Sequence, residues 1–220
     1  NALTGAVSFN TTGSSGYALV DNGTTALNVG ASSVGGNLTL TSGHASGITD
    51  SGTVTVGGNL TATTDANSGV INLGTLAVDG TVAFATNGTG NATLVNDAGL
   101  NFAASTVGGA LNATATIGNM TDSGALAITG TSSFTTSANN ANITLNNTNV
   151  FAGAVTLNTT GSTGNALVDN GTTALNVAAS TVGGNLTLTS GHASGITDSG
   201  TVTVGGNLTA TTDANSGVIN

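Results

Sequence analysis

The feature that most constrains this chain is a long internal repeat. Residues 5–72 return as residues 153–220, shifted by 148 positions, with only six substitutions between the two copies. No single folding motif needs so long a segment, so a repeat of this length is expected to contain smaller units. The chain is therefore predicted to be a regular array.

A glycine followed by alternating apolar residues marks the smaller unit. The pattern begins at Gly5, Gly36, Gly58, Gly80, Gly109, Gly130, Gly153, Gly184 and Gly206. Successive glycines are spaced by 21 to 31 positions, and six of these intervals make one long repeat. The apolar positions, such as Leu38 and Leu40, alternate with polar ones, such as Thr39. This alternation is typical of a strand with one buried face.

Two further short strands fit into each interval. One precedes the glycine, as in residues 53–56, and one follows a loop of small residues, as in residues 47–50. A coil of about 22 residues cannot bury its apolar side chains alone, so successive coils must stack and pair their backbones. The sequence therefore predicts an all-β fold, a parallel β-solenoid with three short strands per coil, coils of about 22 to 31 residues and one continuous array over residues 1–220.

The longest intervals contain extra residues at matching places, 27–34 and 100–107. We interpret these segments as bulged or extended corners of the solenoid. Insertions in a repeat usually collect on one face, which often binds a ligand. A longer strand without functional meaning is the simpler interpretation, and we prefer it.

The composition fits a narrow solenoid and excludes several partners. The chain has 35 glycines, no proline and only 4% charged residues, compared with about 25% in an ordinary globular domain. All nine charges are Asp, and no Lys or Arg occurs. Nucleic acid and anionic membrane surfaces are therefore not expected as partners, because both are bound mainly through cationic side chains. The absence of cysteine is uninformative, since stacked coils need no disulfide.

The chain begins and ends inside a repeat, and no signal peptide, membrane-spanning stretch or polar capping segment is evident. Solenoids need polar caps to prevent pairing between their ends. We therefore expect residues 1–220 to be part of a longer array.

Few residues suggest chemistry, and no cofactor other than calcium is suggested. His44 and His192 occupy the same repeat position in a Ser-Gly-His-Ala-Ser-Gly loop, without a second histidine or a cysteine nearby. A zinc site needs three or four ligands, so a solvated loop histidine is the better interpretation. The spacing of Ser, His and Asp residues supports no catalytic triad.

Five aspartates form the weak metal candidates. Asp21, Asp50, Asp122, Asp169 and Asp198 each follow an apolar strand residue by two positions and precede Asn-Gly or Ser-Gly, and Asn96 takes the equivalent place after Leu94. Stacking is expected to place them at one corner of nearby coils. There they would bond turn amides, which is our preferred interpretation, or bind calcium, because like charges this close need a counter-ion.

Residues 26–39, 47–56 and 151–157 resemble the repeats of giant bacterial surface proteins, the filamentous-haemagglutinin-like and beta strand repeat adhesins. The resemblance covers essentially the whole chain. It implies a secreted, right-handed parallel β-helix on a bacterial surface or in an extracellular matrix, where such repeats mostly form the stalk. Neighbouring repeats, copies of the chain and surface glycans are the partners that the resemblance suggests.

Three functions remain open. A non-catalytic structural stalk or filament is favoured by all features above. An ice- or surface-binding solenoid is suggested by outward Thr and Asn columns such as Thr39, Thr61 and Thr187, although Ala83 interrupts them. A polysaccharide-cleaving β-helix is least favoured, because such enzymes need paired carboxylates with cationic groups, and the chain has no Lys, Arg or Glu.

Overall fold

The computed structural model describes residues 1–213 and 216–220, and every regular element in that part of the chain is a β-strand. The first strands are β1 (Asn10–Thr11), β2 (Ala18–Asp21), β3 (Leu27–Val29), β4 (Ser32–Val34), β5 (Leu38–Ser42), β6 (Ile48–Asp50), β7 (Val54–Val56), β8 (Leu60–Thr64) and β9 (Ile71–Val78). The middle strands are β10 (Thr81–Ala85), β11 (Ala92–Asn96), β12 (Leu100–Phe102), β13 (Ser105–Val107), β14 (Leu111–Ala115), β15 (Met120–Asp122), β16 (Leu126–Ile128), β17 (Ser132–Asn139) and β18 (Ile143–Leu145). The last strands are β19 (Val150–Phe151), β20 (Val155–Thr160), β21 (Ala166–Asp169), β22 (Leu175–Val177), β23 (Ser180–Val182), β24 (Leu186–Ser190), β25 (Ile196–Asp198), β26 (Val202–Val204) and β27 (Leu208–Thr212).

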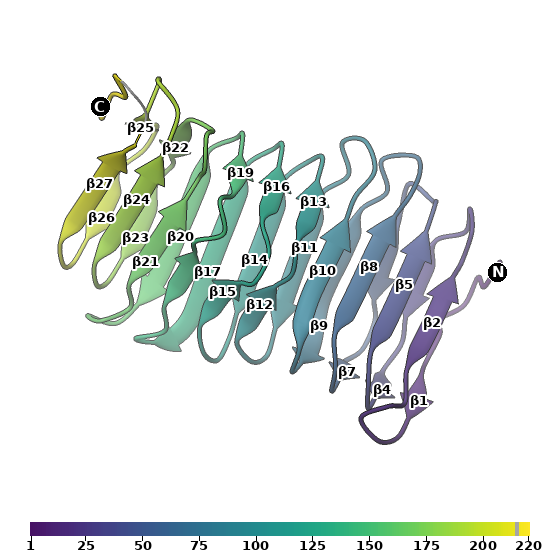
Figure 1. Ribbon diagram of the computed structural model, residues 1–220. Coiled ribbons are helices and arrows are strands. Elements are labelled where there is room, and N and C mark those ends of the chain that lie inside the picture. Colours follow the sequence, from purple (N-terminus) through teal and green to yellow (C-terminus); the bar gives the residue numbers. More distant parts are fainter. Residues whose placement is uncertain (214–215) are drawn as a thin grey trace.

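The strands stack in two long sheets that face each other along one axis (Figure 1). The larger sheet, sheet A, follows the order β1-β4-β7-β9-β11-β14-β17-β20-β22-β25, and the other, sheet B, ends in β18-β21-β24-β27. Every pairing is parallel, and each turn pairs with the turns before and after it. The predicted all-β parallel β-solenoid is confirmed, with about nine turns and three strands per turn. No helix in the described part of the chain is long and apolar enough to cross a membrane.

The turns are more uniform than the glycine intervals suggest. Paired residues of adjacent turns are 19 to 23 positions apart, from Ala92 and Leu111 to Ile48 and Ile71. The expectation of coils as long as the longest glycine interval is therefore wrong in this detail. Seven turns, not six, separate Val7 from Leu157 in sheet A.

The long glycine intervals arise because the strand that follows each pattern glycine does not stay in one sheet. β5, β8 and β10 lie in sheet B, β14, β17 and β20 lie in sheet A, and β24 and β27 lie in sheet B again. Each change takes about one and a half turns. The segments from Gly5 to Gly80 and from Gly80 to Gly153 are the two halves of the long repeat, and each contains about three and a half turns. Successive half-repeats therefore present the same surface on opposite sides of the solenoid.

Residues 27–34 and 100–107 mark these changes. They are neither bulged corners nor one longer strand, the two interpretations considered above, but pairs of short strands that stack on one longer strand. β10 pairs with both β12 and β13. At the break between the two short strands, the Ser105 hydroxyl accepts the N–H of Phe84 at 3.1 Å. Ser32 and Ser180 do the same for Phe9 and Leu157.

The core is a narrow layer between the two sheets, as predicted. Its buried side chains are mainly Val, Leu, Ile and Ala. The sequence pattern did not predict an aromatic stack in the centre, where Phe84, Phe102, Phe134 and Phe151 pack edge to face with ring centroids 5.4 to 6.1 Å apart. Such pairs add about 0.5–1.5 kcal/mol each beyond the burial of their area.

Candidate functional site

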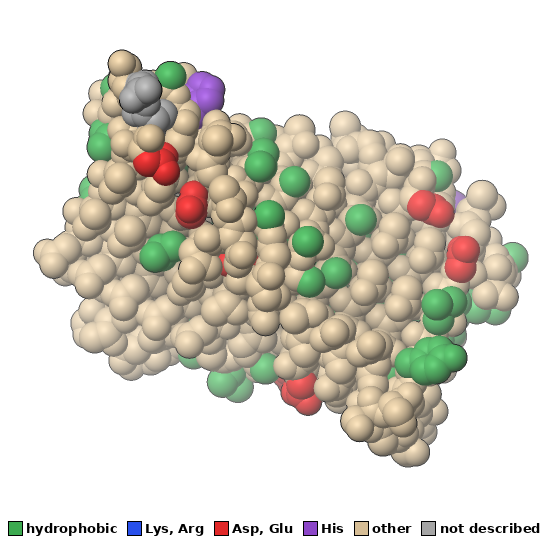
Figure 2. Space-filling model, viewed as in Figure 1, with side chains coloured by type: hydrophobic (Ala, Val, Ile, Leu, Met, Phe, Trp, Pro, Cys, Tyr) green, Lys and Arg blue, Asp and Glu red, His purple; other side chains and the backbone are tan. Residues whose placement is uncertain are grey.

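The five candidate aspartates do not gather at one corner. Asp50 and Asp198 end strands of sheet A, whereas Asp21, Asp122 and Asp169 end strands of sheet B. The expectation of a common corner is therefore wrong, because the change of sheets moves equivalent residues to opposite sides. Figure 2 shows aspartates as separate spots on a surface without any Lys or Arg. Among the residues that the structure describes, no group of three or more His, Cys, Asp or Glu side chains is close enough to hold a metal ion.

Asp50 and Asp122 connect one turn to the next. The Asp50 carboxylate accepts the backbone N–H groups of Gly74 at 3.0 Å and Thr75 at 2.7 Å, and also the Thr75 hydroxyl. The buried Asp122 carboxylate accepts the N–H groups of Asn146 and Asn147 in the same way. These N–H groups satisfy the acceptor oxygens of both carboxylates without a cation. These two carboxylates thus join neighbouring turns through hydrogen bonds.

Asp21 and Asp169 act within their own turns. Each accepts the N–H of the glycine two positions later, Gly23 or Gly171, at 2.8 Å. Such Asx turns set the path of the chain at a corner. Asp198 lies exposed at the end of β25, and its carboxylate has no hydrogen bond within the described residues. The preferred structural role thus has a geometric basis in four of the five candidates, and calcium binding stays an untested alternative.

Buried asparagines are the polar feature that the sequence pattern did not predict. Asn22, Asn96, Asn149 and Asn170 are 0% exposed. The Asn96 amide accepts the N–H of Val78 at 2.9 Å and donates to the Val78 carbonyl at 3.1 Å, so the side chain replaces a strand residue in the ladder. Asn170 pairs with the N–H and carbonyl of Phe151 in the same way.

This geometry also corrects the sequence alignment of Asn96. The sequence pattern places it at the position of the five candidate aspartates, but its burial and bonding match Asn22 and Asn170, which directly follow Asp21 and Asp169. The Asn-Gly and Asn-Asp-Ala-Gly turns at these places were the available signal.

A second row of asparagines runs along the outside of a corner. The side-chain oxygen Oδ1 of Asn119 accepts the N–H of Asn142 at 2.8 Å, and the side chains of Asn142, Asn165 and Asn185 continue the row to Asn207 in the same way. Glycines allow the close approach of turns at such corners. A Cβ on Gly58 would lie 2.7 Å from the carbonyl carbon of Gly36. Asn119, Asn142, Asn185 and Asn207 each begin an Asn-x-Thr triplet, and the row gives the asparagine of these triplets a structural contact.

The two histidines are not brought together. His44 Nδ1 accepts the N–H of Ser46 at 3.0 Å, and His192 Nδ1 accepts that of Ser194 at 3.0 Å. Each histidine therefore closes its own loop.

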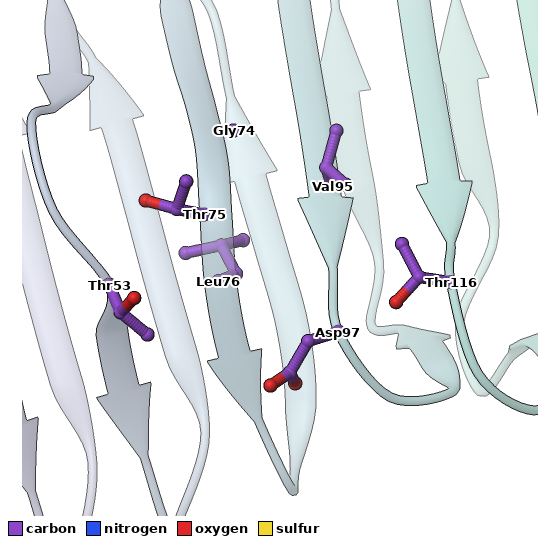
Figure 3. A pocket seen from close by; sticks show the side chains of 7 residues that line it. All are labelled: Thr53, Gly74, Thr75, Leu76, Val95, Asp97 and Thr116. Carbon is purple, nitrogen blue, oxygen red and sulfur yellow. The ribbon is translucent and has the colours of Figure 1, made fainter.

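A shallow groove of about 280 Å³ lies on the outer surface of sheet A (Figure 3). Its side chains come from four neighbouring turns and include Thr53, Thr75, Val95, Asp97 and Thr116. Asp97 is the one titratable residue in this lining. A single exposed carboxylate provides no acid–base pair for hydrolysis.

Comparison with known proteins agrees with the repeat structure. A family model for repeats of unknown function, DUF5649, matches residues 15–75, 89–158 and 163–220. The three matches begin at equal intervals, at positions 15, 89 and 163, which corresponds to the half-repeat that changes sheets. No curated protein and no solved structure matches the chain. The matched segments make up most of its length, and the chain therefore belongs to the DUF5649 family of repeats of unknown function.

Proposed function

We propose that this chain is a non-catalytic stalk or filament segment of a secreted bacterial surface adhesin or extracellular matrix fibre. The observation that carries the proposal is the direction of its bonds. Backbone pairing, the outer asparagine row and the Asp50 and Asp122 carboxylates all connect one turn to the next along a single axis. Such an architecture extends in length by adding turns, which is the property that a stalk needs.

The surface supports the same proposal. Its charged side chains are nine Asp, without any Lys or Arg, and this favours solubility over nucleic-acid or anionic-lipid binding. The absence of Lys and Arg also removes every trypsin site, an advantage for an extracellular polymer. The resemblance to filamentous-haemagglutinin-like repeats adds the bacterial surface as the place and neighbouring repeats, other copies or glycans as partners.

An internal deletion in the complete protein tests this proposal. Residue 153 repeats residue 5, so removing residues 5–152 should leave the stack in register and remove seven turns. At about 4.8 Å per turn the fibre should shorten by about 34 Å. Electron microscopy of the secreted material would measure this change, and immunolabelling of intact cells would test surface display. Compact particles with capped ends, or a wholly intracellular protein, would contradict the proposal.

An ice- or crystal-binding surface is the second candidate, and one observation favours it. Thr39 pairs with Thr61 and Thr41 pairs with Thr63, so sheet B presents two aligned rows of hydroxyl and methyl groups. The next turn carries Ala83 and Ala85, after which the pattern moves to sheet A. The ordered patch is therefore small. Inhibition of ice recrystallisation that is lost in Thr61→Asp would support this candidate over the stalk.

A further inference from the structure

Three Asn-Gly pairs in this chain share one backbone turn. The glycines Gly23, Gly88 and Gly171 have φ angles of 54°, 57° and 51°. In each turn the N–H three residues after the asparagine donates to the asparagine carbonyl, at 3.1, 3.1 and 3.0 Å. The backbone conformations are thus nearly the same, and any difference in reactivity must come from the side chains and their contacts.

In two of the three pairs, hydrogen bonds hold both the asparagine side chain and the glycine N–H in place. The Asn170 side chain is 0% exposed, accepts the N–H of Phe151 at 2.7 Å and donates to the carbonyls of Phe151 and Ala174. The N–H of Gly171 donates to the Asp169 carboxylate at 2.8 Å. The Asn22-Gly23 pair has the same arrangement, with Asp21 as the acceptor.

The pair Asn87-Gly88 is different. Both residues are exposed, and within the described residues neither the Asn87 side chain nor the Gly88 N–H has a hydrogen bond. Besides the turn itself, Asn87 is anchored by a long contact of 3.4 Å from its own N–H to the Thr64 hydroxyl. In the part of the chain that the structure describes, no carboxylate accepts the Gly88 N–H as Asp169 accepts that of Gly171.

We propose that Asn87 is a site of spontaneous deamidation in the folded protein, whereas Asn22 and Asn170 are protected. The Gly88 nitrogen attacks Cγ of Asn87, a new N–Cγ bond forms, the Cγ–Nδ2 bond breaks, and the side-chain nitrogen leaves as ammonia while the Gly88 nitrogen gives up its proton. Water then opens the five-membered imide at either carbonyl. The product is aspartate, or isoaspartate with one additional methylene in the main chain.

The difference in rate follows from the contacts. Reaction at Asn170 requires its side chain to leave at least three hydrogen bonds, each of which changes an opening equilibrium by about fivefold, so the buried pair should react about a hundredfold more slowly than Asn87. The occupied Gly171 N–H slows it further. Glycine favours this reaction, since a side chain at the following residue would hinder the attack.

The modification adds one negative charge at an exposed corner, while the stack itself is expected to survive. Asn87 lies outside the strands, between β10 and β11. The corner is closed on its inner side by the Thr86 hydroxyl, which donates to the Gly90 carbonyl at 2.8 Å. The stalk would therefore become more acidic with age at one defined place in this segment.

Mass spectrometry of the intact folded protein after ageing in warm, mildly alkaline buffer tests the proposal. Cleavage before aspartate isolates residues 79–96 with Asn87 and residues 169–197 with Asn170. We expect the one-dalton increase of deamidation in the first peptide, as isoaspartate or as a new cleavage site at residue 87, and at least about a hundredfold less in the second. The Asn87→Gln variant should lose the rapid increase.

The same ageing in denaturant is the control. There the three Asn-Gly pairs should react at similar rates, which would assign the difference to the fold. Equal rates at residues 87 and 170 in the folded protein would overturn the proposal, and so would an unmodified Asn87 in the folded protein when the denatured sample reacts. In a further variant, Asp169→Ala, the rate at Asn170 should rise only modestly, because its side chain stays buried.

Discussion

The buried Asn96 offers the sharpest test of how this solenoid is held together. Its amide accepts the Val78 N–H at 2.9 Å and donates to the carbonyls of Val78 at 3.1 Å and Gly99 at 2.6 Å. In Asn96→Ala three backbone groups lose their partner. A buried polar group without a partner costs about 1–3 kcal/mol, so the variant should lose at least about 3 kcal/mol of local stability.

Hydrogen exchange at the Val78 amide measures this loss directly. A loss of about 3 kcal/mol corresponds to exchange that is about a hundredfold faster if exchange follows local opening. Asn72→Ala is the matched control, because Asn72 lies in the same strand, β9, with an exposed side chain. A surface substitution of this kind is expected to change stability by less than about 0.5 kcal/mol.

Asn96→Asp separates the acceptor from the donors. The carboxylate keeps an acceptor for Val78 N–H but loses both donated bonds and buries a charge, so this variant should be no more stable than Asn96→Ala. If the amide of Val78 exchanged equally in Asn96→Ala and Asn72→Ala, the idea that asparagine side chains serve as rungs of the ladder would be refuted.

Three further outcomes are expected. Leu38→Asp buries an unpaired charge and should lower the melting temperature and the β-signal in circular dichroism strongly, whereas Thr39→Asp on the outer face should be mild, and equal losses would show that the faces are misassigned. Phe134→Ala should cost about 3–5 kcal/mol in chemical denaturation, since it removes a fully buried ring that packs on two others, and a loss below about 1 kcal/mol would mean that the stack contributes little. A calcium chelator should leave the melting temperature unchanged, because the Asp50 and Asp122 carboxylates already accept N–H groups, and a large calcium stabilisation abolished by Asp122→Asn would contradict this.

The local elements were largely predictable. Alternation in residues such as Leu38, Thr39 and Leu40 correctly separates buried from outward positions, because a strand turns its side chains to opposite faces at each step. The candidate site was less predictable, because local spacing gives Asn96 and Asp21 the same place after a strand residue although the Asn96 side chain lies inside.

The sequence by itself determined the strand pattern, the stacking of coils and the lack of Lys and Arg side chains, all of which depend on residue type and short-range spacing. Only the tertiary structure decided which side of the solenoid each strand occupies. A half-repeat of about three and a half turns places β14 in the sheet opposite to its sequence equivalent β5, so residues that look equivalent in sequence, such as Asp50 and Asp122, lie on opposite sides. The physical reason is that the length of a turn is set by backbone pairing between neighbouring coils, which places paired residues 19 to 23 positions apart, and not by the distance between glycines.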